Sequence, residues 1–341
     1  MSYNGCALEP ADIYYIVSEA IVAVASVVGN CMVVLAVKVD KSLRNVTFFF
    51  IVSLAVADIS CGIVLIPLAI TIAVGLQTSF YGCLLMACII LTITQGSILS
   101  LLAIAVDRFL KVKMPTRYRC IVTPFRGCVA VGICWSTSAL LGMLPIFGWH
   151  NRETIKTEQN STDDHIKCEF GSVIKLEYMM FFNVLGWFFP LTIMIMLYAA
   201  VFYIIRKQFS FKTENGQQSI NYYKKEMKLA KSLSLVLLLF ALTFIPMHAM
   251  NIIEYACSAN IKKSIKYTGI ILSHLNSAVN PVVYAFRIKK FRRVFIRIGS
   301  LNISNMNVKQ KRLNAQFSSD DNLDSNRTYE LTKNSTEKQG K

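Results

Sequence analysis

Several polar side chains lie within long apolar stretches of the sequence, where a charged group is costly unless it faces the protein interior or water. Asp58 is the clearest case, because it ends the segment SLAVAD inside an apolar run, far from any basic residue in sequence. Amide and hydroxyl side chains occur at a similar depth in other runs: Asn30, Ser97, Asn276 and Asn280. Together with Asp58 their oxygen atoms could enclose a hydrated cation such as sodium, because hard cations prefer oxygen ligands. A hydrogen-bond network without an ion explains the same residues equally well.

A second set of ionisable residues lies at the ends of apolar runs. Asp107-Arg108-Phe109 places an arginine at the end of the third run, and Glu226 opens the sixth helix on the same side. A contact between Arg108 and Glu226 would hold two helices together. On its own, a charge pair at two helix ends is mostly solvated and contributes little to stability.

Prolines interrupt three of the apolar runs, at Pro190, Pro246 and Pro281. A proline inside a helix removes a backbone hydrogen bond and kinks the helix. Asn280 and Tyr284 flank Pro281 and add polar groups whose bonding can change when this helix bends. Single prolines are common in membrane helices, so the prediction of movable helices rests on the whole set.

The elements that position these residues are seven apolar runs. Hydrophobic residues make up 54% of the 341 positions and charged residues only 16%, which indicates a membrane protein. A run of about 20 apolar residues spans the hydrocarbon layer as a helix. The seven runs are Ile13–Val37, Phe48–Val74, Cys83–Val106, Cys128–Phe147, Tyr178–Ile205, Leu229–Ile253 and Tyr267–Phe286. We therefore predict an all-α fold, a bundle of seven transmembrane helices.

The distribution of basic residues predicts the orientation of this bundle. Lysine and arginine accumulate after the first, third, fifth and seventh runs, and they accumulate on the cytoplasmic side of membrane proteins. The N-terminus is therefore expected outside and the C-terminus inside, in a multi-pass protein of the plasma membrane. The net charge of +16 indicates topology and attraction to anionic membrane lipid, and we expect no nucleic-acid binding.

The chain divides into three parts. Residues 1–13 form an extracellular N-terminus without the features of a signal peptide. Residues 14–298 form the membrane domain, which ends in RIKKFRRVFIRI (Arg287–Ile298), a pattern typical of a short amphipathic eighth helix on the membrane surface. Residues 299–341 are polar and predict a disordered cytoplasmic tail.

Two covalent features are expected on the extracellular side. Asn160 lies in a glycosylation sequon in the loop before the fifth run. Cys83 and Cys168 both lie outside and could pair in an oxidising compartment. Cys6 and Cys257 also lie outside, and for these two a disulfide and free thiols are equally compatible with the sequence.

The order and spacing of eight motifs resemble the rhodopsin-like, class A G-protein-coupled receptors. The motifs are Gly29-Asn30, Asp58, Cys83, Asp107-Arg108-Phe109, Trp135, Pro190 with Tyr198, Phe240 with Pro246, and Asn280–Tyr284. The resemblance implies that an agonist bound outside swings the sixth helix outward and opens a cytoplasmic crevice for a heterotrimeric G protein. Arrestin and receptor kinases are further partners that it implies, and it implies no enzymatic activity.

Within this class, longer segments resemble the adenosine receptors, and type 3 most closely. They are IVSLAVADISCGIVLIPLAI, SLLAIAVDRFLKVK, PIFGW, KLAKSLSLVLLLFAL and SHLNSAVNPVVYAFRIKKF. Ile90 stands where amine receptors hold an aspartate, which argues against an amine ligand. The resemblance implies adenosine as ligand, coupling to Gi/o with inhibition of adenylyl cyclase, and no cofactor other than an allosteric sodium ion.

The resemblance also implies a set of ligand-binding residues. Asn251 matches the amide that accepts from and donates to adenine, and Phe170 matches the loop aromatic that stacks on the purine. Glu19 matches the carboxylate that orients His274. Polar groups around the ribose would be Thr94, Gln95, Ser273 and His274. The remaining wall would be Ile90, Met179, Asn183, Met247, His248 and Ile270. Simpler roles are open for two of these residues, an interhelical bond for His248 and a loop plug for Phe170.

Some positions depart from the family pattern. Phe244 stands where most relatives have a tryptophan, Phe109 replaces the tyrosine after Arg108, and Gly171 replaces a glutamate beside the purine. The loss of the tryptophan puts the usual activation switch in doubt. A class A receptor with another ligand, a lost ligand or constitutive activity is therefore the alternative. A transporter or membrane enzyme is disfavoured, because neither paired repeats with broken helices nor a catalytic constellation occurs in the runs.

Overall fold

A computed structural model of the protein describes residues 9–40, 46–153, 165–211, 217–257 and 261–299. Residues 1–292 and residues 293–341 form two separate units, and the helix bundle belongs to the first. Three predictions concern residues outside the described part. They are the glycosylation of Asn160, the pairing of Cys6 and the disorder of the tail from residue 300 onward.

The described residues are almost entirely helical. The helices are α1 (Pro10–Val39), α2 (Val46–Ser60), η2 (Cys61–Leu65), α3 (Ile66–Val74), α4 (Phe80–Lys113), α5 (Tyr118–Ile121), α6 (Pro124–Met143), η3 (Leu144–Phe147), α8 (Phe170–Val173), α9 (Leu176–Phe181), η4 (Phe182–Phe188), α10 (Phe189–Phe211), α11 (Gln217–Cys257), α12 (Lys263–Arg287) and α13 (Lys289–Gly299). The strands are β1 (Gln77–Ser79) and β2 (His165–Lys167). Segments η2 and η4 are π-helical, and η3 is a 3₁₀ helix.

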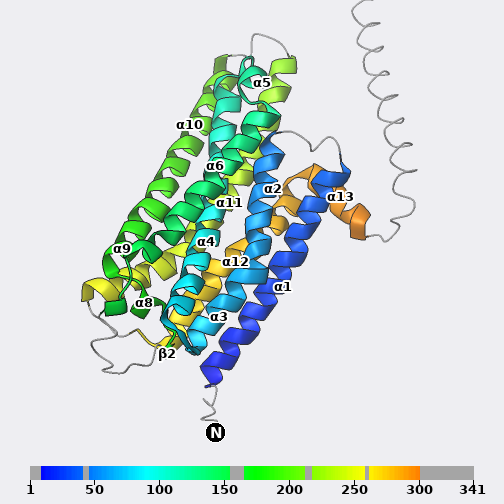
Figure 1. Cartoon of the computed structure of the whole chain (residues 1–341). Coiled ribbons are helices and arrows are strands. Elements are labelled where there is room, and N and C mark those ends of the chain that lie inside the picture. Colours follow the sequence, from blue (N-terminus) through cyan, green and yellow to red (C-terminus); the bar gives the residue numbers. More distant parts are fainter. Residues whose placement is uncertain (1–8, 41–45, 154–164, 212–216, 258–260, 300–341) are drawn as a thin grey trace, which may run out of the picture. The chain divides into compact units, whose positions relative to one another are not determined.

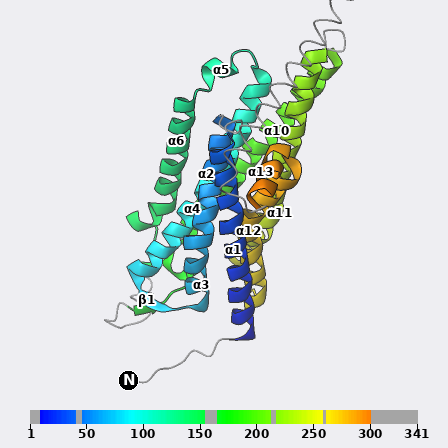
Figure 2. The same ribbon diagram turned by 90° about the vertical axis from the view of Figure 1, so that its right-hand side faces the viewer.

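Seven helical columns run side by side through the described part of the first unit (Figure 1). Four columns are single helices, α1, α4, α11 and α12, and three are composite, α2–η2–α3, α6–η3 and α9–η4–α10. This confirms the predicted seven-helix fold. The β1–β2 pair is a small addition that the all-α prediction did not include. Figure 2 shows α6 at the edge of the bundle beside α4.

Six of the seven columns are long and apolar enough to cross a membrane, within the described residues. The seventh, α12, falls short because it carries many polar residues, and five of them are buried: Ser273, His274, Asn276, Ser277 and Asn280. In contrast, large apolar side chains such as Ile21, Leu140 and Tyr203 are 66%, 71% and 67% exposed. Polar groups inside and apolar groups outside are the arrangement that a lipid environment requires.

The two ends of the bundle differ in structure. At one end, called the hairpin end, Gly75 adopts a left-handed conformation with φ of 72°, which ends α3 and turns the chain into β1. Strand β1 pairs antiparallel with β2, and the disulfide Cys83–Cys168 ties the first turn of α4 to the residue after β2, as predicted. The opposite end, called the α5 end, carries α5 and the start of α11. Thr123 caps α6 there by accepting from the Arg126 amide at 3.3 Å.

The helix that carries Glu226 is longer than the sequence predicted. The apolar run begins at Leu229, and we expected Glu226 to open the helix, but α11 begins at Gln217. A helix can continue into water through polar residues. The apolar pattern therefore marks only the buried part of the helix. Glu226 therefore lies well inside α11. Pro246 and Pro281 lie inside α11 and α12, as predicted.

The contact between α4 and α6 depends on a glycine. A Cβ atom built on Gly142 would lie 2.2 Å from the Thr92 hydroxyl oxygen and 2.6 Å from its backbone nitrogen. The nitrogen belongs to the backbone of α4 and cannot rotate away, so a side chain at Gly142 would push the two helices apart. Gly132, ten residues earlier in α6, has no neighbouring atom within 4 Å of a built Cβ.

We predict that Gly142→Ala lowers the free energy of unfolding by about 1–3 kcal/mol, the usual cost of overpacking a close contact. Thermal unfolding of the purified receptor in detergent would measure the loss. Gly132→Ala is the matched control and should be neutral or stabilising by up to about 1 kcal/mol, because alanine is the better helix former. Equal melting temperatures for the two variants would contradict the proposed contact.

Candidate functional site

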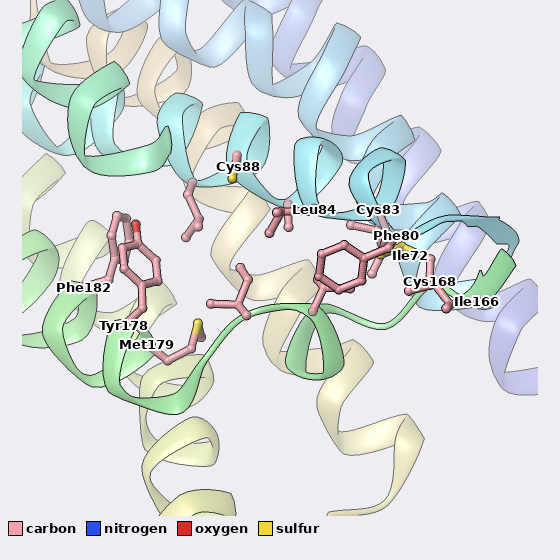
Figure 3. Packing of buried hydrophobic residues seen from close by; sticks show 14 residues of the cluster. Ile72, Phe80, Cys83, Leu84, Cys88, Ile166, Cys168, Tyr178, Met179 and Phe182 are labelled. Atoms are coloured by element: carbon pink, nitrogen blue, oxygen red, sulfur yellow. A yellow bond between two sulfur atoms is a disulfide. The ribbon is translucent and has the colours of Figure 1, made fainter. Parts of the chain in front are cut away.

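An apolar cluster at the hairpin end holds the loop aromatic that the sequence singled out. Phe170 begins α8 two residues after Cys168, and it packs against buried residues of α4, α9 and the loop. Met179 belongs to the same cluster and Ile90 also packs against it, so three of the predicted ligand-binding residues share one apolar cluster. Figure 3 shows Met179 near Tyr178 and the disulfide between Cys83 and Cys168. The disulfide fixes the chain from which Phe170 projects.

A small cavity lies deeper, between α2–η2, α4, α11 and α12. Its polar lining includes three predicted ribose contacts, Thr94, Ser273 and His274, and Phe244 supplies an apolar wall. The Thr94 hydroxyl donates to the carbonyl of Ile90 at 2.9 Å, and the Ser273 hydroxyl donates to the carbonyl of Ile270 at 2.7 Å. Because each hydroxyl donates its proton to its own helix, each oxygen keeps lone pairs with which to accept from another group.

His274 is oriented by a buried carboxylate. Its Nδ1 lies 2.9 Å from both Glu19 carboxylate oxygens, which are contributed by α1 and are fully buried. A buried charge needs such a partner, because its desolvation is otherwise uncompensated. The contact is the one that the sequence analysis expected, and it fixes one ring nitrogen so that Nε2 remains for another group.

Two predicted wall residues, His248 and Asn183, and one predicted ribose contact, Gln95, lie between α4, η4 and α11. His248 Nδ1 lies 2.7 Å from Asn183 Oδ1, so the interhelical bond considered for His248 is present. Gln95 is 1% exposed, and its Oε1 would lie 2.9 Å from a Cβ built on Gly186 of η4. Sequence analysis missed Trp187, which packs on His248 with ring centroids 4.2 Å apart. Its signal was weak, a single tryptophan in the fifth apolar run three residues before Pro190.

Three other predicted residues are half-buried and lie outside the described lining of the cavity. Asn251 and Met247 are one turn apart on α11, and Ile270 lies one turn before Ser273 on α12. The two helices are close at this level, because a Cβ built on Gly269 would lie 3.7 Å from the Met247 Cα. The structure thus places Asn251 on α11, one turn from the point at which this helix meets α12.

The polar residues around Asp58 form an interhelical network. Asn280 Nδ2 donates to Asp58 Oδ2 at 2.8 Å, and Asn30 Nδ2 donates at 2.9 Å to the carbonyl of Ser277. The Ser26 hydroxyl donates to the Asp58 carbonyl at 2.8 Å. The network therefore ties α1, α2 and α12 together.

Four oxygen atoms of this region are buried without a hydrogen-bond partner: Asp58 Oδ1, Asn30 Oδ1, Ser97 Oγ and Asn276 Oδ1. Ser97 and Asn276 also line the cavity. Buried oxygens that lack a partner are uncommon and indicate a bound water or ion, or another arrangement of the chain. All four are oxygen atoms, and oxygen is the ligand that a hard cation prefers.

A buried charge cluster lies at the α5 end. Arg108, 2% exposed, contacts Asp107 at 2.5 Å and Glu226 of α11 at 3.3 Å. Lys111, one turn further along α4, binds the other Glu226 oxygen at 3.0 Å. Since Glu226 is only 6% exposed, the pair is not the solvated surface contact that the sequence left open. One anion on α11 is shared by two cations on α4.

Two further elements support Asp107. The Thr47 hydroxyl donates to its Oδ2 at 2.8 Å, Arg108 also contacts Thr47, and the Tyr118 hydroxyl of α5 donates to Oδ1 at 2.5 Å. Burial, and then the Asp107 charge, raise the pKa of Tyr118, so its hydroxyl stays protonated. Asp107 therefore holds α2, α4 and α5 together.

Two tyrosines of the receptor motifs are buried near this end. Tyr198 on α10 is 6% exposed and Tyr284 on α12 is 1% exposed. The Tyr284 hydroxyl has no hydrogen-bond partner in the described residues, and its ring stacks on Phe291 at 5.6 Å. A buried hydroxyl without a partner is costly, so Tyr284 is suited to an arrangement in which α12 shifts.

This fold, with its buried arginine cluster and its polar network at Asp58, is that of a membrane receptor. Residues 29–284 match the family model described as 7 transmembrane receptor (rhodopsin family). The chain therefore belongs to the rhodopsin-like, class A G-protein-coupled receptors. It is a multi-pass membrane receptor and not an enzyme.

The chain is also similar to individual receptors of this family. The chain is 43% identical over 299 residues to Adenosine receptor A3 of Canis lupus familiaris, covering 87% of this chain and 94% of the relative. It is 43% identical to Adenosine receptor A3 of Bos taurus and 42% identical to that of Ovis aries, covering 87% of this chain and 93% of each relative.

We predict that Glu226→Gln raises ligand-free signalling. The change removes the charge shared by Arg108 and Lys111, and charged hydrogen bonds of this kind correspond to about a tenfold shift in a two-state equilibrium. Nucleotide exchange on purified heterotrimeric G proteins without ligand would measure it. Glu254→Gln, which breaks the half-exposed ion pair to Lys266 at the other end of α11, is the matched control and should leave the rate unchanged. An unchanged rate for Glu226→Gln would contradict a latching role.

Proposed function

We propose that the protein is a receptor for adenosine that signals through a Gi/o protein and inhibits adenylyl cyclase. The observation that carries the proposal is the cavity in which His274, oriented by Glu19, shares a wall with Thr94 and Ser273. Hydroxyl-rich ligands such as a ribose need several buried polar partners at once. The identity to the adenosine receptors of three mammals over 87% of the chain supports the choice of nucleoside.

The cavity has a volume of about 20 Å³, which is room for about one water molecule. The proposed pose therefore places the ribose against its polar wall, with neighbouring side chains moving aside, and the purine toward the hairpin end. Ribose hydroxyls donate to the Thr94 and Ser273 oxygens, and His274 presents Nε2 to the same group. The purine then reaches Phe170 for stacking and Asn251 for two hydrogen bonds to its amine and ring nitrogen. Ile90, Met179, Met247 and Ile270 supply apolar walls, while Gln95, Asn183 and His248 lie at the side.

Ligand binding would act on α11. Pro246 lies two residues from Phe244 in the cavity wall, and Glu226 lies about five turns from Phe244 along the same helix, toward the α5 end. A bend at Pro246 moves Glu226 away from Arg108 and Lys111 and opens the α5 end to the G protein. Arrestin and receptor kinases are expected at the same end, and the protein is expected in the plasma membrane with its N-terminus outside.

The identity of the nucleobase is tested at Asn251. We predict that Asn251→Ala weakens adenosine binding by about 10- to 100-fold, the value of a bidentate contact to adenine. It should also abolish discrimination between adenosine and inosine, which carries an oxygen in place of the amine. Competition binding and cAMP measurements would check both. Thr268→Ala, an exposed residue of α12 whose hydroxyl bonds its own helix, serves as control. A full adenosine response in Asn251→Ala would rule out the proposed pose.

The four buried acceptors around Asp58 support a second proposal, an allosteric sodium ion at this site. Asp58 supplies the charge, and Asn30, Ser97 and Asn276 supply neutral oxygens. Bound sodium would neutralise a carboxylate that lacks any basic partner in the described residues and would stabilise the arrangement in which α1, α2, α4 and α12 surround it.

We predict that sodium chloride raises the melting temperature of the purified receptor relative to choline chloride at equal ionic strength, because a cation that binds only the folded state stabilises it. Asp58→Asn should abolish the difference. Asp12→Asn is the control, since Asp12 is also buried but is paired with Lys263 at 2.8 Å and Tyr267 at 2.6 Å. Equal melting in both salts would favour the network without an ion.

A receptor with constitutive activity is the second candidate, favoured by Phe244. This residue lines the cavity where relatives have a larger indole, so the side chain fills less space beneath the ligand. High nucleotide exchange by the unmodified receptor, with no increase on adding adenosine, would favour this candidate.

A further inference from the structure

A row of stacked rings follows one face of α11. Phe240, Phe244 and His248 are spaced by four residues, and their ring centroids are 4.7 Å and 6.1 Å apart in sequence order. All three are at most 8% exposed. Residues four apart lie one above another on a helix, so the row forms a continuous contact along two turns.

The row spans the position at which α11 lacks a backbone hydrogen bond. Pro246 lies between Phe244 and His248, and its missing N–H leaves the carbonyl of Leu242 without its usual backbone bond. Phe244 therefore moves with the part of α11 that carries Glu226, and His248 moves with the part that carries Asn251. The contact between these two rings joins the halves of a helix that can bend there.

His248 is in turn held from outside α11. Asn183 accepts from its Nδ1 at 2.7 Å, and Trp187 packs on its ring with centroids 4.2 Å apart and planes 32° apart. Both partners come from η4, whose π-helical turn precedes Pro190. Such turns interrupt the regular backbone and often occur at functional positions. Phe188, also of η4, has its ring centroid 6.5 Å from that of His248. The ring of His248 is thus held by one polar contact and two ring contacts to the neighbouring column, of which the contact to Trp187 is the closer.

Trp187 has an unused capacity in this arrangement. Its side chain is 2% exposed, and its Nε1 donor is buried without a hydrogen-bond partner. The Gln95 Oε1 acceptor is also buried without a partner, and it lies beside Gly186, the residue before Trp187. A donor and an acceptor that are both unsatisfied on neighbouring elements favour a second arrangement in which they meet.

We propose that Trp187 is a positioning residue for signalling and takes the place of the tryptophan missing at position 244. In the resting receptor its indole clamps His248 and holds the outer half of α11 against η4. On activation the indole leaves His248 and its N–H donates to Gln95 Oε1, which allows α11 to bend at Pro246. The inference rests on the proposed function only in taking adenosine as the activating ligand.

The clamp is tested without ligand by comparing three variants. Trp187→Leu removes the ring and is expected to raise ligand-free nucleotide exchange about two- to tenfold, the range that corresponds to one aromatic pair. Trp187→Phe keeps a ring on His248 and is expected to stay near the unmodified rate. Trp149→Leu is the matched control, because Trp149 packs on Tyr178 and Phe181. Receptor amounts are equalised by an epitope tag. An unmodified rate in Trp187→Leu would overturn the proposal.

A spectroscopic readout separates signalling from mere packing and serves where Trp187→Leu fails to fold. The chain has three tryptophans, and only Trp187 is expected to change its surroundings on activation. Adenosine should alter tryptophan emission of the unmodified receptor, and most of that change should be lost in Trp187→Phe. An equal change in both proteins would overturn the proposal. If adenosine does not bind at all, the proposed ligand is wrong, while the ligand-free comparison still decides the role of Trp187.

Discussion

A polar group surrounded by lipid must find its partner within the protein, and this constraint determines where the working parts of the receptor lie. Asp58 bonds Asn280, Glu19 bonds His274, and Arg108 is enclosed by carboxylates. Each pair joins two different helices, because water is not there to satisfy either side. The same contacts that satisfy buried polar groups therefore also define the relative positions of the helices.

This constraint explains how much could be predicted from the sequence. Polar residues inside apolar runs are conspicuous, so the fold, the Asp58 network and the contact of Arg108 with Glu226 followed from their types and positions. The resemblance to known receptors added the pairing of Glu19 with His274. The shared side of Cys83 and Cys168 made their disulfide possible, and the structure confirms it, although Cys6 and Cys257 were predicted on that side as well. In each case the sequence contained a residue whose chemistry requires a partner.

What could not be predicted depends on shape rather than on polarity. Trp187 is an apolar residue in an apolar run, and only the coordinates place it on His248. The approach of Gly142 to Thr92 could not be predicted from the sequence either. Gly132 is a glycine of the same helix, and it has open space around it. The start of α11 at Gln217 was missed because hydropathy indicates which part of a helix is buried. The helix itself continues beyond that part into water.

The tight contact of Gly142 with Thr92 has a mechanical consequence. Where backbone meets backbone without an intervening side chain, neither helix can rotate or slide without a collision, so α4 and α6 behave as one rigid frame. Helices α11 and α12 also approach closely, at Gly269, but each contains a proline at which its backbone hydrogen bonding is interrupted. The α4–α6 pair is thus suited to act as a fixed support against which the proline-containing helices α11 and α12 can bend.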